Sequence, residues 1–107
     1  MSPSETEAAG RRLVQKLRGP DAGGRARAAI CLSEMGEETL PVLGELIDAL
    51  NDPDPAVRRV AAWVLGYVGL SCPEAVRALD RAATDSDGSV RKAARAALTV
   101  SSLRHAA

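Results

Sequence analysis

Residues 52–69, DPDPAVRRVAAWVLGYVG, carry the pattern from which the fold can be predicted. A residue before a proline is pushed out of the α region, so Asp52 and Asp54 end any preceding helix. Pro55 loses nothing at the first position of the next helix, because its missing N–H would have no partner there. Asp54 is expected to cap that helix, with its carboxylate accepting from a first-turn N–H. Arg58, one turn on, is expected to pair with Asp54 or with an aspartate of an adjacent unit.

The second part of this stretch occurs three times, at a spacing of 33 residues. The copies are DAGGRARAAICLSEMG (21–36), DPAVRRVAAWVLGYVG (54–69) and DGSVRKAARAALTVSS (87–102). The segments between them align at the same spacing through Leu13, Leu46 and Leu79. A period of this length indicates stacked units, none of which buries its apolar face alone.

Each segment predicts a helix, because its apolar residues recur at helical spacing. Six helices are expected, at about residues 5–18, 22–35, 39–51, 55–69, 73–84 and 88–101. We therefore predict an all-α fold in a single domain over residues 1–107. Residues 1–4 and 103–107 are expected to be flexible termini.

The middle copy resembles a HEAT-like repeat of the phycobilisome-lyase type. The pattern D-x-x-V-R-x-x-A-A-x-x-L-G is present as Asp54, Val57, Arg58, Ala61, Ala62, Leu65 and Gly66. The first copy departs from it, with Gly24 in place of the valine and Ser33 in place of the glycine. The resemblance covers about residues 10–100. It implies a short right-handed α-solenoid of about three stacked antiparallel helix pairs, with the second helix of each pair lining a concave face.

The resemblance also implies a ladder of charged side chains between neighbouring repeats. Its members would be the aspartate and arginine that begin each copy, namely Asp21, Arg25, Asp54, Arg58, Asp87 and Arg91. An anion-binding site formed by the arginines is the alternative. Their regular recurrence at helix starts favours the structural role.

The composition is neutral overall, but its charge is unevenly placed. Fourteen Lys and Arg balance fourteen Asp and Glu, whereas a dedicated nucleic-acid binder usually has a large basic excess. Residues 37–54 carry six acidic side chains and no basic one. The first residues lack the basic and apolar regions of a signal peptide, and no apolar run has the length of a membrane span. We therefore expect a cytoplasmic protein that does not bind a membrane and is a poor candidate for nucleic-acid binding.

The sequence contains no recognisable catalytic, cofactor-binding or metal-binding constellation. His105, the single histidine, is interpreted as a solvated tail residue. Cys31 aligns with Val64 and Ala97, so we expect it to be packed in the core, and Cys72 to be more exposed. The protein is therefore predicted not to be an enzyme and to need no cofactor.

The exposed faces predict a protein-binding scaffold or adaptor. Aligned positions that vary on the segments between the copies are candidate partner contacts, namely Arg12, Gln15, Glu45, Asp48 and Arg81. Glu45 and Asp48 are expected at the centre of the concave face, where they favour a protein or peptide partner with basic groups. Trp63 and Tyr67 form a second candidate patch, unless they pack over a groove between helices.

Two further possibilities stay open. An accessory factor of a lyase or of a cofactor-attachment system, like the bilin lyases, follows from the resemblance alone. Self-association through the terminal repeats is also possible, because the C-terminal helix shows little of the polar cap that ends most solenoids. Its apolar residues are Ala93, Ala96, Ala97, Val100 and Leu103.

Overall fold

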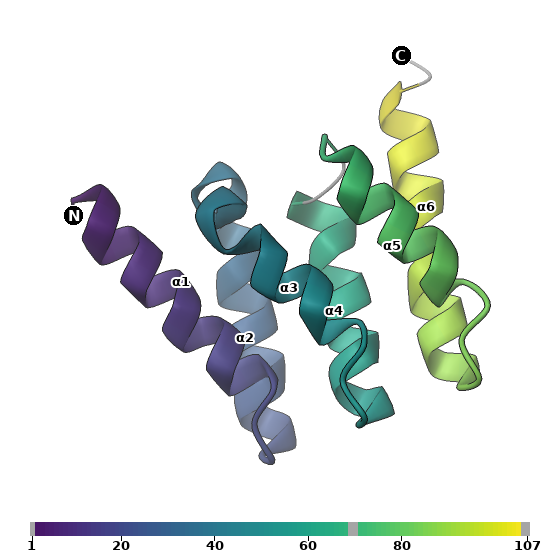
Figure 1. Cartoon of the computed structure of the whole chain (residues 1–107), viewed down its shortest axis with the longest axis horizontal. Helices are drawn as coiled ribbons and strands as arrows, with labels where there is room; N and C mark the ends of the chain where they lie inside the picture. The colour runs from purple at the N-terminus through teal and green to yellow at the C-terminus, as the bar shows by residue number, and fades with distance from the viewer. Residues whose placement is uncertain (1, 69–70, 106–107) are drawn as a thin grey trace.

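The computed structural model describes residues 2–68 and 71–105, and these residues are helical apart from short turns. The elements are α1 (Pro3–Leu17), α2 (Ala22–Met35), the 3-10 helix η1 (Gly36–Val42), α3 (Leu43–Ala49), α4 (Pro55–Val68), α5 (Pro73–Ala82) and α6 (Gly88–His105). Consecutive helices form the pairs α1–α2, α3–α4 and α5–α6, which stack side by side (Figure 1). The predicted all-α fold, a short solenoid of stacked helix pairs, is confirmed.

The prediction of an α-helix over residues 39–51 is wrong at its start. Residues 36–42 form η1, and the α-helix begins only at Leu43. Gly36 ends α2 with a φ of 58°, a left-handed conformation that favours glycine. Pro41, inside η1, has no N–H to continue an α-helical hydrogen-bond pattern through this segment. The buried Thr39 hydroxyl instead donates to the Gly36 carbonyl at 2.7 Å.

Other helix ends differ from the prediction by a few residues. The first helix starts at Pro3, because the Ser2 hydroxyl accepts from the Glu5 N–H and caps it. The last helix continues to His105, four residues beyond the predicted end, and α5 ends at Ala82. The predicted end of the fourth helix at Gly69 lies outside the described residues. Whether the two ends of the chain are mobile stays a prediction.

The helices lie in two layers, and neighbouring helices pack more closely in one layer than in the other. Figure 1 shows α1, α3 and α5 in front of α2, α4 and α6. In the rear layer α4 packs extensively on α2 and α6, whereas in the front layer α3 meets α1 and α5 at few residues. Closer packing on one side curves a stack toward that side. We therefore call α2, α4 and α6 the inner layer, and α1, α3 and α5 the outer layer.

Aliphatic side chains and alanine fill the space between the layers. The largest fully buried side chains include a leucine from each of α1 to α5, namely Leu17, Leu32, Leu46, Leu65 and Leu79. Within the inner layer α4 and α6 come unusually close at Gly66. A Cβ placed on Gly66 would lie 2.8 Å from the Cβ of Ala97. The absence of a side chain at this position therefore sets the spacing of the second and third repeats.

The prediction that Cys31 is buried in the core is wrong. Cys31 is exposed, although the aligned residues Val64 and Ala97 are buried. Ala97 of α6 faces the preceding inner helix, α4, through Gly66. Cys31 holds the equivalent position on α2, which is the first inner helix, so no inner helix of this chain covers it. Cys72, expected to be exposed, is half-buried, and both cysteines are free thiols.

The opposite face of the stack carries larger polar side chains. Ala62 and Gly66, one turn apart on the α4 face that meets α6, are buried. The equivalent residues on α6 are Arg95 and Thr99, and both are exposed. Another helix packed on α6 in the same register would meet these two side chains. We call this surface the polar end of the stack.

Candidate functional site

The three aspartates that begin the copies cap the inner helices. Each carboxylate of Asp21, Asp54 and Asp87 accepts a hydrogen bond of 2.8 or 2.9 Å from a first-turn N–H, donated by Gly24, Ala56 and Ser89 respectively. The pKa of Asp87 is lowered, first by the hydrogen bond from the Ser89 hydroxyl and then by that from the Val90 N–H. The three carboxylates therefore act as N-caps of α2, α4 and α6.

The three arginines one turn further on bind the loop that precedes their own helix. Each Nη1 donates at 2.8 Å to a carbonyl six residues earlier: Arg25 to Gly19, Arg58 to Asp52 and Arg91 to Asp85. This differs from the pairing of Arg58 with Asp54, one of the two alternatives that the sequence offered. Because the guanidinium donors are used on loop carbonyls, the geometry favours a structural role over an anion-binding site.

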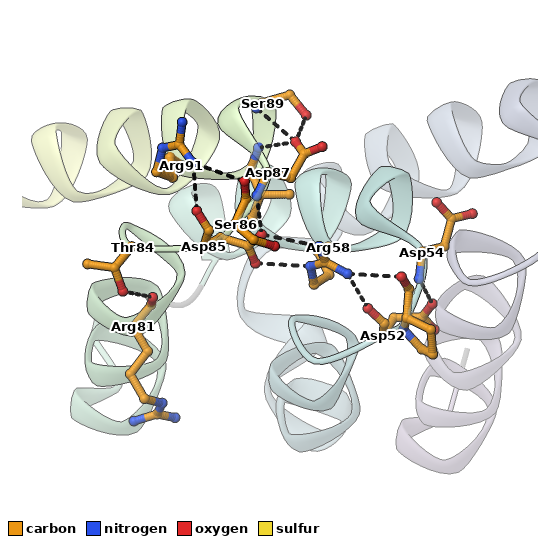
Figure 2. A network of polar contacts seen from close by, with 12 residues as sticks. Asp52, Asp54, Arg58, Arg81, Thr84, Asp85, Ser86, Asp87, Ser89 and Arg91 are labelled. Atoms are coloured by element: carbon orange, nitrogen blue, oxygen red, sulfur yellow. Dashed lines mark hydrogen bonds and ion pairs between the residues drawn. The ribbon is translucent and has the colours of Figure 1, made fainter.

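Arg58 also connects the second repeat to the third (Figure 2). Its Nε and Nη2 donate to the two carboxylate oxygens of Asp85, in the α5–α6 loop, at 3.0 and 3.1 Å. Only 15% of the Arg58 side chain and 13% of the Asp85 side chain are exposed. Between the first two repeats, a comparable link is made by Arg18, whose Nε lies 3.0 Å from the carboxylate of Asp52.

Sequence reasoning missed Asp52 and Asp85 as the inter-repeat acceptors. Each has one carboxylate oxygen that accepts from the N–H two residues on, Asp54 or Asp87, at 2.9 and 2.8 Å. This fixes each carboxylate within its turn. From there Asp52 contacts the arginine of the preceding repeat through its other oxygen, and Asp85 does so through both oxygens. The spacing Asp-x-Asp, present in the second and third copies, was the available signal. The first copy has Gly19 at that position.

The contact with Arg58 makes part of the stability depend on pH. The pKa of Asp85 is lowered from its ordinary value of 3.8, chiefly by the side-chain hydrogen bond from Arg58, and burial opposes this. The same hydrogen bond raises the pKa of Arg58. A carboxylate whose pKa is lower in the folded chain than in the unfolded chain stabilises the fold fully at a pH above its unfolded-state pKa. That stabilisation is lost as the pH falls through its folded-state pKa.

We expect an Asp85→Asn variant to show this window directly. The free energy of unfolding of the variant should lie below that of the parent by a constant amount between about pH 5 and 7. Below pH 3.8 the difference should shrink, because only the parent has a carboxylate to protonate at this position. Urea unfolding of both proteins from neutral pH to about pH 2 measures it. A difference that stays constant down to the lowest pH would contradict the assignment to Asp85.

An apolar groove runs between α4 and α6 on the inner layer. One hollow of ≈ 180 Å³ is lined by Trp63, Gly66, Tyr67, Ala93, Ala96, Ala97 and Val100. A second hollow of ≈ 360 Å³ is lined by Arg59, Val60, Trp63, Ser89, Lys92, Ala93 and Ala96. Because Trp63, Ala93 and Ala96 line both hollows, we treat them as one feature and call it the inner groove.

Trp63 and Tyr67 form the wall of the inner groove on α4. Their rings make an edge-to-face contact, with centroids 5.0 Å apart and planes inclined by 61°. The residues remain 41% and 53% exposed, so the groove covers them only in part. On α6 the position equivalent to Trp63 is Ala96. The inner groove exists because this small residue stands opposite the large ring.

The remaining candidate contacts lie on the other side of the molecule. Arg12, Gln15, Glu45, Asp48 and Arg81 belong to α1, α3 and α5, the outer layer. The expectation that Glu45 and Asp48 occupy the centre of the concave face is therefore wrong. Glu45 also has a partner already, since its carboxylate lies 3.4 Å from Nε of Arg11. The structure thus separates the sequence candidates into two surfaces, one on each layer.

The two layers differ in charge, although the chain is neutral. Up to residue 100, the inner helices carry one acidic residue, Glu34, and seven basic ones: Arg25, Arg27, Arg58, Arg59, Arg91, Lys92 and Arg95. The outer helices carry six acidic residues, Glu5, Glu7, Glu45, Asp48, Glu74 and Asp80, and five basic ones, Arg11, Arg12, Lys16, Arg77 and Arg81, while Glu37 and Glu38 lie on η1. Counted over the helices alone, the inner layer therefore has the basic excess, which the capping carboxylates of Asp21, Asp54 and Asp87 at its helix starts offset only in part.

The basic side chains of the inner layer differ in whether they already have a hydrogen-bond or ion-pair partner. Three of them hold loop carbonyls, and Arg27 lies 3.7 Å from the carboxylate of Asp21. Arg59, Lys92 and Arg95 are exposed, and no carboxylate of residues 2–68 or 71–100 lies within ion-pair distance of them. Arg59 and Lys92 line one end of the inner groove.

Among the side chains that the structure describes, no three or more His, Cys, Asp or Glu residues are grouped so that they could hold a metal ion. Within 2–68 and 71–105, no helix combines the length and the apolar character needed to cross a membrane.

Comparison with known proteins agrees with the observed architecture. The family profile for HEAT repeats matches residues 10–99, from within α1 to within α6. No curated protein matches the chain. HEAT repeats generally serve as protein-interaction scaffolds and are typically not enzymes. Since the match covers most of the sequence, the chain belongs to the HEAT repeat family.

Proposed function

We infer that this chain is a non-catalytic adaptor that holds a partner protein in the inner groove. The observation that carries this inference is the exposed pair Trp63 and Tyr67 beside the alanines of α6. Tryptophan and tyrosine are enriched among the residues that dominate binding energy, because each buries a large rigid surface at low entropic cost. Soluble proteins rarely leave large apolar patches in contact with water, so an exposed aromatic pair beside an apolar groove is typical of a surface that a partner protein covers.

If the inner groove binds the partner, substitutions that remove its aromatic wall should abolish binding. A Trp63→Ala/Tyr67→Ala variant should lose the partner, since truncating such an anchor commonly costs about 2 kcal/mol or more, or roughly 30-fold in affinity. A Glu45→Lys/Asp48→Lys variant, altered on the outer layer, is the matched control and should keep it. Both are used as bait in native lysate, and captured proteins are quantified by mass spectrometry. Circular dichroism first establishes that both variants are folded.

The opposite result would place the binding surface on the outer layer. Loss of partners only in the Glu45→Lys/Asp48→Lys variant would move the binding surface to the outer layer and favour the basic partner predicted from the sequence. Equal capture by both variants and the parent protein would contradict binding at either surface.

Finer assignments rest on the sequence alone. The phycobilisome-lyase subtype, and with it a role as an accessory of cofactor attachment, is supported only by the resemblance. Bilin-carrying proteins among those lost from the Trp63→Ala/Tyr67→Ala bait would support that role. Self-association and a cytoplasmic location also stay predictions, and light scattering of the purified protein tests the first.

A further inference from the structure

The shape of the inner groove limits what can occupy it. The groove extends from Ser89 and Arg59 at one end to Val100 and Tyr67 at the other. Residues 89 to 100 lie on one helix, so the groove is about 16 Å long, or three helical turns, at about 1.5 Å per residue. Such a length suits a short secondary-structure element better than a single side chain.

The chemistry of the groove floor selects a helix over an extended segment. The floor consists of Gly66, Ala93, Ala96 and Ala97, all within helices, so their backbone N–H and C=O groups are used internally. An extended peptide needs hydrogen-bond partners for its own backbone, and alanine side chains provide none. A helix satisfies its backbone internally and presents apolar side chains at i, i+4 and i+7.

The charge around the groove defines the polar face of the occupant. Arg59 and Lys92 stand at one end, and Arg95 is exposed on the same helix as Lys92. The carboxylates nearest in sequence to this end, Asp54 and Asp87, are directed to the helix N–H groups that they cap. The cations at this end are thus available to carboxylates of a partner.

Resting on the proposed function, we propose that the inner groove binds an acidic amphipathic helix of a partner protein. Apolar side chains of that helix pack between Trp63 and Ala96. Its carboxylates lie at the end of the groove that holds Arg59 and Lys92. Single-stranded nucleic acid is the main competitor, because a base can stack on an exposed tryptophan beside basic side chains.

The unique tryptophan allows a direct test with the whole chain. Trp63 is the only tryptophan, so its emission reports occupancy of the inner groove. The probes are a tryptophan-free helical peptide with leucines at i, i+4 and i+7 and glutamates on its other face, the same peptide with lysines for glutamates, and an oligothymidylate. The acidic peptide should shift the emission to the blue and saturate. The lysine peptide should bind roughly tenfold more weakly or less well still.

Charge reversal at the end of the groove provides the second arm. An Arg59→Glu/Lys92→Glu variant, altered at exposed positions, should reverse the preference between the two peptides while its circular dichroism stays that of the parent. Equal binding of both peptides, no reversal in the variant, no response to either peptide, or tighter binding of the oligothymidylate would each overturn the proposal.

Failure of the acidic-helix proposal can be distinguished from failure of the proposed adaptor function. If captured partners are lost on Trp63→Ala/Tyr67→Ala but not on Arg59→Glu/Lys92→Glu, the groove binds protein and the acidic helix is wrong. If neither variant loses partners, the adaptor function in this groove is itself wrong.

Discussion

An Arg58→Ala variant is expected to unfold with a free energy about 2–4 kcal/mol below that of the parent protein. The parent side chain makes a two-point contact with Asp85 and donates to the carbonyls of Asp52 and Pro53 at 2.8 and 3.0 Å. Its removal leaves a largely buried carboxylate without its charged partner, and the α3–α4 loop without its clamp. Removing one member of a buried pair costs more than the pair contributes, because the other charge stays desolvated.

The matched control is Arg59→Ala, which removes the same side chain one position along α4. Arg59 is exposed, so its loss should change stability by about 0.5 kcal/mol or less. Thermal melts followed by circular dichroism compare the two, and Arg58→Ala should lower the Tm by about 10 °C or more. If both variants melt at the same temperature, the inter-repeat role of Arg58 is refuted.

Gly66→Ala should destabilise the protein by about 1–2 kcal/mol, even though alanine is the better helix former by about 1 kcal/mol. The new methyl group would lie 2.8 Å from the Cβ of Ala97 and 3.1 Å from its Cα. The Cα belongs to the backbone of α6, so a rotamer change cannot relieve the contact. The second and third repeats would have to move apart, which weakens the packing of α4 on α6.

Gly44→Ala is the control, with the same chemical change on another helix. Apart from its chain neighbours and the backbone of its own helix, no atom lies within 4 Å of a Cβ placed on Gly44, which is exposed on α3. This substitution should therefore stabilise the protein by about 0.5–1 kcal/mol. Urea unfolding of the two variants should give changes of opposite sign. A stabilising Gly66→Ala would show that α4 and α6 are less closely packed than described.

The sequence was informative where a feature repeats. The spacing of 33 residues located the six helices and the capping aspartates, because each copy obeys the same local rules at its start. It could not locate η1, which follows the first copy and, within the described residues, has no counterpart after the second. It also suggested that Arg58 faces either Asp54 or a neighbour. The choice of Asp85 depends on the distance between repeats, which no local pattern contains.

Alignment of the copies wrongly predicts the burial of residues at the ends of the stack, and it does not tell in which layer a residue lies. It groups Cys31 with Val64 and Ala97 because their helix positions match, yet burial depends on whether another repeat covers that position. It likewise led us to expect Glu45 and Asp48 on the concave face, because variation at aligned exposed positions does not tell which layer carries them; both lie on α3 of the outer layer. Trp63 and Tyr67 were recognisable because they break the repeat. Their groove was not, because it depends on Ala96 of another copy.

The polar end of the stack has a consequence for assembly. Joining the last repeat of one molecule to the first of another is a head-to-tail contact, which forms a ring if the rotation between copies closes and a filament if it does not. Such growth would require α6 to accept a helix as closely as α4 accepts α6. Arg95 and Thr99 stand where Ala62 and Gly66 permit that approach. At such a contact these two side chains would prevent the close approach that Ala62 and Gly66 allow between α4 and α6, so we expect head-to-tail joining through α6 to be unfavourable.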